Sequence, residues 1–233
     1  MTRVKRGKFI TLEGGEGAGK STQIRHILAH LTAVGITALA TREPGGTPHA
    51  EALREVLLSG RAKNLGPAAE AMLFSAARID HIENLIEPAL RERKWVVCDR
   101  FSDSTRAYQG AMGNLDARFM QALEQVTLGA LYPDLTIILD IDPRLGLARA
   151  AQRRGQGEGA DRFEGEALAF HKALREAFRD IAEREPLRCV LIDAAQGEAK
   201  VAAQIIKVID ERLFDARLRA RAEALIHDSR PAQ

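Results

Sequence analysis

The feature that most constrains this chain is a glycine-rich octet between an apolar stretch and a stretch with helical periodicity. Its residues are Gly14, Gly15, Glu16, Gly17, Ala18, Gly19, Lys20 and Ser21. The octet matches G-x-x-x-x-G-K-[ST], a pattern in which glycines let successive backbone N–H groups point at phosphate oxygens. Lys20 can reach the β- and γ-phosphates, and the Ser21 hydroxyl can bind Mg²⁺. The octet therefore predicts a site for a nucleoside triphosphate with Mg²⁺.

Apolar strands alternate with helices along the chain. Short apolar runs that end at turn residues predict strands at 8–13, 36–41, 95–99, 135–141 and 187–193. Apolar residues at helical spacing predict helices at 20–33, 49–58 and 67–93, with a kink or interruption at Pro88 in the last. This alternation indicates an α/β fold with a parallel sheet covered by helices on both faces.

One domain is expected over residues 1–213, because no repeat or low-complexity linker divides the chain of 233 residues. Residues 152–161 are rich in glycine and charge, and we expect them to form a mobile loop between helices. Residues 214–233 are charged with sparse apolar positions, and we expect them to form a frayed helical appendage.

Composition and charge narrow the class of protein. Hydrophobic residues make up 45% and charged residues 28%, which is ordinary for a globular protein and argues against a disordered, fibrous or membrane protein. The 34 basic and 32 acidic residues leave a charge of +2, so we expect neither a nucleic-acid polymer nor a membrane as partner. Two cysteines in apolar runs fit a reduced, cytoplasmic protein.

A second informative stretch is DRFSDSTRAYQG, from Asp99 to Gly110. Asp99 ends a predicted buried strand, at the edge of the sheet where ligands bind in open α/β folds. A carboxylate there can organise Mg²⁺ through water, and the neighbouring Arg100 can clamp the phosphate of an acceptor. The stretch therefore predicts the acceptor side of a phosphoryl-transfer site.

Other uses of the triphosphate fit the sequence less well. A GTPase would read guanine with N-K-x-D, which does not occur, and the third strand ends Asp99-Arg100 rather than in the Asp-Glu of a motor ATPase. His26 and His30 share a helix face but have no third metal ligand. Two classes of protein stay open at this point. One is a kinase that phosphorylates a nucleoside monophosphate or a deoxynucleoside, and the other is a nucleotide-dependent switch protein.

Five segments together resemble the thymidylate kinase family, and the resemblance runs from about residue 9 to residue 193. In family order they read FITLEGGEGAGKST, TREPGGT, FSAAR, DRFSDSTRAYQG and ADRFE. The resemblance implies a P-loop NTPase fold with five parallel strands in the order 2-3-1-4-5 and helices on both faces. It also implies ATP-dependent phosphorylation of dTMP to dTDP with Mg²⁺, by a homodimer.

The resemblance further implies a role for each matching residue. ATP would contact the octet and Thr22, and Mg²⁺ would be held by Ser21 and Asp99. The residues implied for dTMP are Glu16, Pro44, Phe74, Arg78, Arg100, Thr105, Tyr108 and Gln109. Among these, Phe74 would stack on thymine, Arg78 and Arg100 would contact the monophosphate, and Thr105 and Gln109 would lie near the base. Tyr108 would favour deoxyribose, and Glu16 would reach the 3′-hydroxyl.

Catalysis is implied for Lys20, Arg100 and one lid arginine, either Arg153 or Arg154, because the octet itself contains no arginine. The loop at 152–161 resembles the family's lid, which would span about 149–164 with Arg149, Arg153, Arg154 and Arg162 as its cations. Arg42 would either line the acceptor pocket or hold its turn in place. Residues 194–197, just after the fifth strand, would pass under the adenine.

Overall fold

The structure, a computed structural model, describes residues 6–154 and 162–228. Five parallel strands form its single described sheet, in the order β2-β3-β1-β4-β5. They are β1 (Phe9–Gly14), β2 (Ala38–Arg42), β3 (Trp95–Asp99), β4 (Leu135–Asp140) and β5 (Cys189–Asp193). The predicted fold class and strand order are confirmed, and the strand ends differ from the prediction by no more than two residues.

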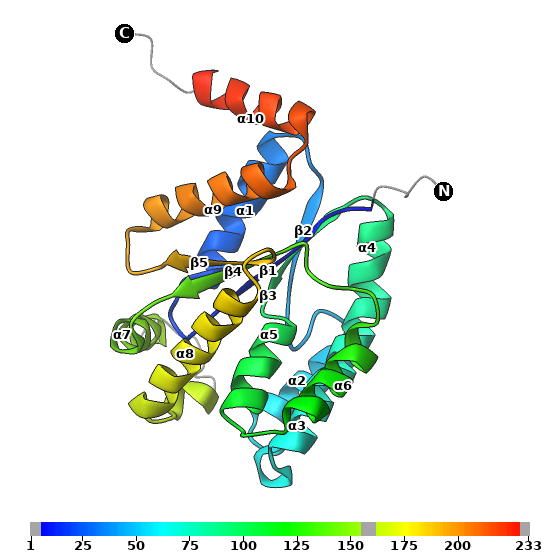
Figure 1. Ribbon diagram of the computed structural model, residues 1–233, viewed down its shortest axis with the longest axis vertical. Coiled ribbons are helices and arrows are strands. Elements are labelled where there is room, and N and C mark those ends of the chain that lie inside the picture. The colour runs from blue at the N-terminus through cyan, green and yellow to red at the C-terminus, as the bar shows by residue number, and fades with distance from the viewer. Residues whose placement is uncertain (1–5, 155–161, 229–233) are drawn as a thin grey trace.

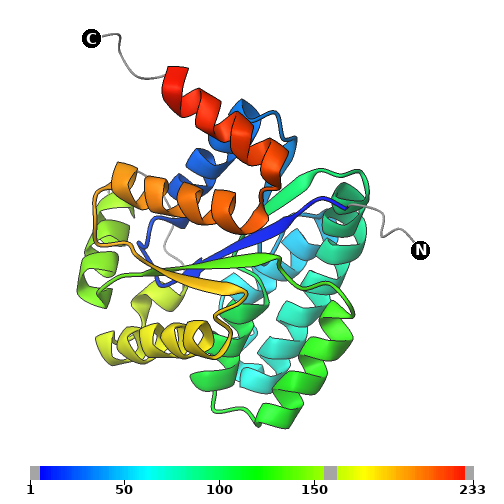
Figure 2. The same cartoon turned by 45° about the horizontal axis from the view of Figure 1, so that its top comes forward.

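Helices cover both faces of the sheet. Around it lie α1 (Lys20–Ala33), α2 (Pro48–Leu58), α3 (Pro67–His81), α4 (Glu87–Arg91), α5 (Ser102–Thr105), α6 (Ala117–Leu128), α7 (Pro143–Arg154), α8 (Leu168–Arg184), α9 (Glu198–Leu213) and α10 (Ala216–Asp228). Helices α1 and α9 lie on one face, whereas α4, α5 and α8 lie on the other with α2, α3 and α6 outside them (Figures 1 and 2). This is a three-layer α/β arrangement.

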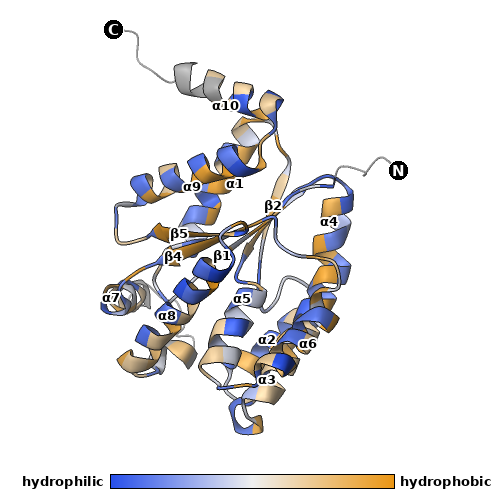
Figure 3. Cartoon of the chain, in the orientation of Figure 1, coloured by the Kyte–Doolittle hydropathy of each residue, from blue (hydrophilic) through white to orange (hydrophobic). Residues whose placement is uncertain are grey.

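Alternation along β1 builds the two halves of the core. Ile10 and Leu12 face α1 and α9, where they pack with residues such as Ile27 and Ile205, all fully or almost fully buried. Phe9 faces the opposite side and meets Phe101 edge to face, with 4.9 Å between ring centroids. Strands buried on both faces need apolar residues throughout, which is why β4 is mostly orange in Figure 3.

Pro88 interrupts the long helix predicted over 67–93. Helix α3 ends at His81, a π-helical turn spans Ile82–Ile86, and α4 begins at Glu87. Proline has no N–H to donate and its ring crowds the preceding turn, so a wider turn just before it relieves the clash. The interruption of the α-helix therefore lies before the proline rather than at it.

Some helical structure was not predicted from the sequence. Residues 102–111 form α5 and a π-helical segment, Arg106–Ala111, although the stretch is polar and lacks helical apolar spacing. Short 3₁₀ turns span Lys63–Leu65 and Arg162–Gly165. Of the predicted lid, residues 155–161 lie outside the described part of the chain. No helix within 6–154 and 162–228 is long and apolar enough to cross a membrane.

The segment after Leu213 starts with a packed residue. Phe214 is 4% exposed, stacks on His30 with 5.8 Å between centroids, and meets Trp95 edge to face at 5.9 Å. Ala222 of α10 is also buried in the same half of the core. The division of the chain at 213 stays a prediction, but Phe214 joins α1, β3 and α10 on this side of the sheet.

We expect Phe214→Ala to lower the free energy of unfolding by about 3 kcal/mol, because it removes a buried aromatic ring and leaves a cavity. Urea denaturation followed by circular dichroism measures this. As a control, Leu187→Ala should change stability by less than about 0.5 kcal/mol, because Leu187 is 94% exposed. An equally small effect of Phe214→Ala would mean that the segment packs too weakly to belong to the core.

Candidate active site

A cavity of about 520 Å³ lies at the carboxyl ends of the strands. Its walls come from the octet, the turn after β2, helix α3, the segment after β3, helix α7 and the turn after β5. The predicted site residues that line it are Glu16, Gly17, Ala18, Gly19, Lys20, Ser21, Thr22, Pro44, Phe74, Arg78, Asp99, Arg100, Thr105, Tyr108 and Gln109. Gly14 and Gly15, the first two residues of the octet, line a much smaller cavity instead.

The octet forms a loop between β1 and α1, as its pattern predicts. Gly17 has φ of +66°, and a Cβ placed there would lie 1.9 Å from the carbonyl oxygen of Gly146 on α7. Only glycine can therefore occupy this position. Lys20 is buried at the start of α1, and its Nζ donates to the carbonyl oxygens of Gly14 at 3.3 Å and Gly15 at 3.2 Å. Burial and the nearby Arg100 lower the pKa of Lys20, although nearby carboxylates oppose the shift.

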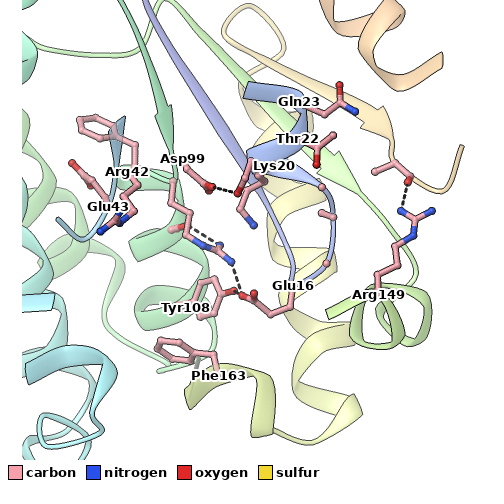
Figure 4. A pocket seen from close by; sticks show the side chains of 18 of the residues that line it. Glu16, Lys20, Thr22, Gln23, Arg42, Glu43, Asp99, Tyr108, Arg149 and Phe163 are labelled. Atoms are coloured by element: carbon pink, nitrogen blue, oxygen red, sulfur yellow. Dashed lines mark hydrogen bonds and ion pairs between the residues drawn. The ribbon is translucent and has the colours of Figure 1, made fainter. Parts of the chain in front are cut away.

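Ser21 and Asp99 come together at the end of β3. The Ser21 hydroxyl donates to Asp99 Oδ2 at 3.2 Å, and both side chains line the cavity (Figure 4). A hydroxyl and a carboxylate are the hard oxygen ligands that Mg²⁺ prefers. Within the described residues no group of three or more His, Cys, Asp or Glu could hold a metal ion.

Arg100 turns back toward the octet. Its φ is +67°, which is unusual for a residue with a side chain. Its guanidinium donates to the Gly14 carbonyl oxygen at 3.1 Å and to Glu16 at 2.6 Å, and it lies over the Tyr108 ring, 5.2 Å from the centroid. Tyr108 also donates to Glu16 at 3.1 Å. The predicted Glu16, Arg100 and Tyr108 therefore form one cluster.

Glu16 is an ionised carboxylate in this cluster. Its burial would raise its pKa, but Arg100, Lys20 and the Tyr108 hydroxyl outweigh burial and lower the pKa to about 2. Conversely, Tyr108 and Glu16 help to raise the pKa of Arg100 against the effect of its own burial. The octet thus holds a fixed negative charge beside two cations.

Arg78 lies at the other end of the cavity, one helical turn after Phe74 on α3. It is 4% exposed and pairs with Glu43 at 2.6 Å. It also donates to the Phe101 carbonyl oxygen at 3.1 Å and to Thr105 Oγ1 at 3.0 Å. Phe74, Arg78 and Thr105 all line the cavity, and we call the part that they line the deep end.

Sequence reasoning missed the buried partners of this deep end. Glu43 accepts a hydrogen bond from Arg78 on one carboxylate oxygen, and its other oxygen lies 3.0 Å from His81 Nδ1. Gln109 donates to the buried Glu70 at 3.5 Å. An acidic residue directly before Pro44 in TREPGGT was the signal that could have indicated Glu43. Glu70 carried no such signal.

The turn after β2 is held by arginines from α2 and β2. Arg54 Nη1 donates to the Pro44 carbonyl oxygen at 2.7 Å, after a cis Glu43–Pro44 peptide bond. Arg42 pairs with Glu51 at 3.0 Å and also lines the cavity. Both of the roles considered for Arg42 are thus compatible with its position. Arg54 was not anticipated.

The opposite wall meets the turn after β5. Arg149 of α7 donates to the carbonyl oxygens of Ala194 at 2.9 Å and Ala195 at 3.3 Å, and Gly197 lines the cavity nearby (Figure 4). Gln23 and Val201 complete this wall and were not predicted. Arg153 and Arg154 end α7, and their side chains lie outside the described part of the structure, as does that of Arg162.

Comparisons with known proteins agree on one family. The family model described as thymidylate kinase matches residues 12–205. Thymidylate kinase from Bradyrhizobium diazoefficiens is 56% identical over 209 residues, which is 90% of this chain and 91% of that protein. Thymidylate kinase from Rhodopseudomonas palustris is 56% identical over 216 residues, covering 92% of this chain and 94% of that one.

A solved structure agrees at the level of the fold. The crystal structure of thymidylate kinase from Ehrlichia chaffeensis matches with a TM-score of 0.71 and 32% sequence identity. The match covers 88% of this chain and 99% of that one. With a family model that spans most of the chain and relatives above half identity, this chain belongs to the thymidylate kinase family.

Proposed function

We propose that this chain transfers the γ-phosphoryl group of ATP to dTMP, forming ADP and dTDP. The observation that carries the proposal is one continuous cavity with a phosphate loop at one end and Phe74 with a buried arginine at the other. A donor and an acceptor nucleotide can meet in such a cavity with their phosphates between Lys20 and Arg100. Membership of the thymidylate kinase family supports both substrates.

The donor side is the octet and the wall beyond it. The ATP triphosphate would lie in the loop Gly14–Ser21 against the first turn of α1, with Thr22 beside it. The start of a helix favours negative charge. The adenine would pass over the turn at 194–197, which Arg149 holds in place. Mg²⁺ would be held by Ser21 and Asp99, where it would neutralise charge between the β- and γ-phosphates.

The acceptor side is the deep end of the cavity. The thymine would stack on Phe74, with Thr105 and Gln109 near its polar edge and Pro44 against the opposite side. Tyr108 would lie against the sugar, at the place where a ribose 2′-hydroxyl would project. Glu16, kept ionised by its cations, would accept from the 3′-hydroxyl.

The two arginines suit different parts of dTMP. Arg78 is already neutralised by Glu43, so a dianionic phosphate placed there would meet a carboxylate at close range. A neutral base carbonyl would not be repelled, and we therefore assign Arg78 to the base rather than to the monophosphate expected from the family pattern. Arg100 is also paired with an acid, Glu16, but that acid is shared with Lys20 of the phosphate loop, so we keep Arg100 as the clamp for the monophosphate.

Transfer then depends on positioning and charge. The acceptor phosphate held by Arg100 would attack in line, while Lys20 stabilises the charge on the transferring group. A lid arginine, Arg153 or Arg154, would add a further cation and exclude water. No covalent intermediate with the protein is needed.

We also propose a cytoplasmic homodimer. Both cysteines are free and buried, which suits a reducing compartment. Two adjacent helices carry exposed apolar residues, Met72 on α3 at 50% and Val126 on α6 at 78%. This pair of helices is the face that we assign to a second copy.

The reaction is tested by ADP release with ATP and Mg²⁺ across a panel of nucleoside monophosphates. We expect strong turnover with dTMP and little with AMP, GMP, CMP or UMP. Phe74→Ala should raise the KM for dTMP about 10- to 100-fold, because stacking on a base is worth about 1–3 kcal/mol. Phe119→Ala is the matched control, since Phe119 is half-buried on α6 and does not line the cavity.

Two results would contradict this reading. Turnover only with another monophosphate would keep the phosphate chemistry but overturn the thymine assignment. Slow hydrolysis that is indifferent to every acceptor would favour a nucleotide-dependent switch.

The Mg²⁺ assignment is tested at the end of β3. Chelation of the metal should abolish transfer, and Asp99→Asn should raise the Mg²⁺ concentration needed for half-maximal activity about 10- to 100-fold. Asp193→Asn is the control, because Asp193 also ends a parallel strand but binds the Ala195 amide instead of lining the cavity. If both variants need the same Mg²⁺ concentration for half-maximal activity, Asp99 does not bind the metal.

The dimer is tested by sedimentation equilibrium. The expected mass is twice the 25.5 kDa of one chain. Val126→Glu should shift the protein toward the monomer, because it buries a charge in an apolar interface. Leu187→Glu, at a 94% exposed position outside α3 and α6, should leave the mass unchanged. A monomeric parent protein would overturn the proposal.

A further inference from the structure

Glu13 is a buried acid that the proposed mechanism does not use. It lies next to the end of β1, directly before the octet, and is 0% exposed. We infer that Glu13 is a positioning residue that holds Arg100 in its left-handed turn, and so keeps the acceptor clamp facing the phosphate loop. This inference rests on the role proposed above for Arg100.

Both carboxylate oxygens of Glu13 bind the segment that follows Arg100. Oε1 accepts from the Phe101 backbone N–H at 2.7 Å, and Oε2 accepts from the Ser104 hydroxyl at 2.6 Å. One side chain thus fixes the residue directly after the turn and the first turn of α5. A side chain with a single acceptor could not satisfy both donors.

The turn needs such support because its backbone is unfavourable. Arg100 has φ of +67°, a conformation that residues with a Cβ adopt only when the surroundings impose it. Two hydrogen bonds from β1 act on consecutive amides: Arg100 N–H donates to the Leu12 carbonyl oxygen at 2.9 Å, and Phe101 N–H donates to Glu13. Relaxation to negative φ would turn the guanidinium away from the octet.

Ser104 links Glu13 to the guanidinium itself. Arg100 Nη1 donates to Ser104 Oγ at 3.2 Å, while the same hydroxyl donates to Glu13. The order of donors and acceptors is therefore fixed from Arg100 through Ser104 to the carboxylate. Glu13 acts on both the backbone and the side chain of Arg100.

Packing alone does not explain why an acidic residue is buried at position 13. Burial and the nearby Asp103 raise the pKa of Glu13 to about 7, although Ser104 and Arg100 oppose the shift. Among the described residues no cation forms an ion pair with Glu13, since Arg100 contacts Glu16 instead. Its hydrogen bonds to the Arg100 segment are what offset this unfavourable burial.

The test is Glu13→Gln, which keeps the shape but replaces one acceptor oxygen by a donor. We expect kcat to fall and the KM for dTMP to rise, together lowering kcat/KM for dTMP about 10- to 100-fold, since small displacements of a positioned group are costly. The KM for ATP should not change. Ser104→Ala, which removes only the link to the guanidinium, should show the same pattern with a smaller loss.

Thr11→Val is the matched control. Thr11 lies on the same strand, is also 0% exposed, and shares a hydrogen bond of 2.7 Å with Thr136 away from Arg100. This variant should be less stable than the parent, but the KM for dTMP should not change relative to the KM for ATP. A crystal structure of Glu13→Gln should show Arg100 released from its positive φ.

Either of two results overturns the inference. The first is that Glu13→Gln has the same kcat and KM values as the parent. The second is that kcat/KM falls equally for dTMP and for ATP, in proportion to the loss of thermal stability. Failure of the proposed function is recognised separately. If the parent enzyme prefers another monophosphate, the same comparison is made with that acceptor, so that the effect of Glu13 on the clamp is still measured.

Discussion

Parallel pairing of β1 with β3 on one side and β4 on the other is the constraint on which the site depends. The register sets Leu12 beside Asp99 and Gly14 beside Leu139, so the octet and the DRFSDST segment start at the same edge of the sheet. The strand order also brings the turns after β2 and β5 to that edge. Segments that are far apart in the sequence thus enclose one cavity, as expected at the carboxyl ends of an open parallel sheet.

Charges in this cavity are held in pairs before any ligand is considered. Glu16 offsets Arg100 at the phosphate end, and Glu43 offsets Arg78 at the deep end. Each pair is largely removed from water, which would be costly for either partner alone. The pairing also separates the two ends chemically. The deep end is close to neutral, whereas the phosphate end has Lys20 as a further cation.

The sequence was sufficient for the parts whose signal is local. Apolar runs bounded by turn residues gave the five strands, and the octet and Asp99-Arg100 indicated the phosphate site. The strand order came from the family resemblance, because periodicity does not specify it. The polar stretch 102–111 forms helix through packing of residues such as Ala107 against the sheet, so propensity could not show it.

The partners of the buried carboxylates could not be found from the sequence, for a different reason. Glu43 binds a residue 35 positions later, and Asp103 binds Arg188, 85 positions away. A single sequence cannot reveal such pairs. An acidic residue is interpreted as exposed to solvent as long as the distant residue that it binds is unknown. The lid arginines stay undistinguished, because their side chains lie outside the described residues.

The close approach of Gly17 and Gly146 fixes how helix α7 contacts the phosphate loop. Each glycine leaves room for the other's backbone: a Cβ on Gly17 would meet the Gly146 oxygen, and one on Gly146 would lie 2.4 Å from the Glu16 oxygen. The first turn of α7 therefore packs directly against the phosphate loop, backbone against backbone. Arg149, one turn further on, is tied to the turn after β5. Helix α7 is thus held at two places, by the phosphate loop and by the turn after β5, before it reaches Arg153 and Arg154.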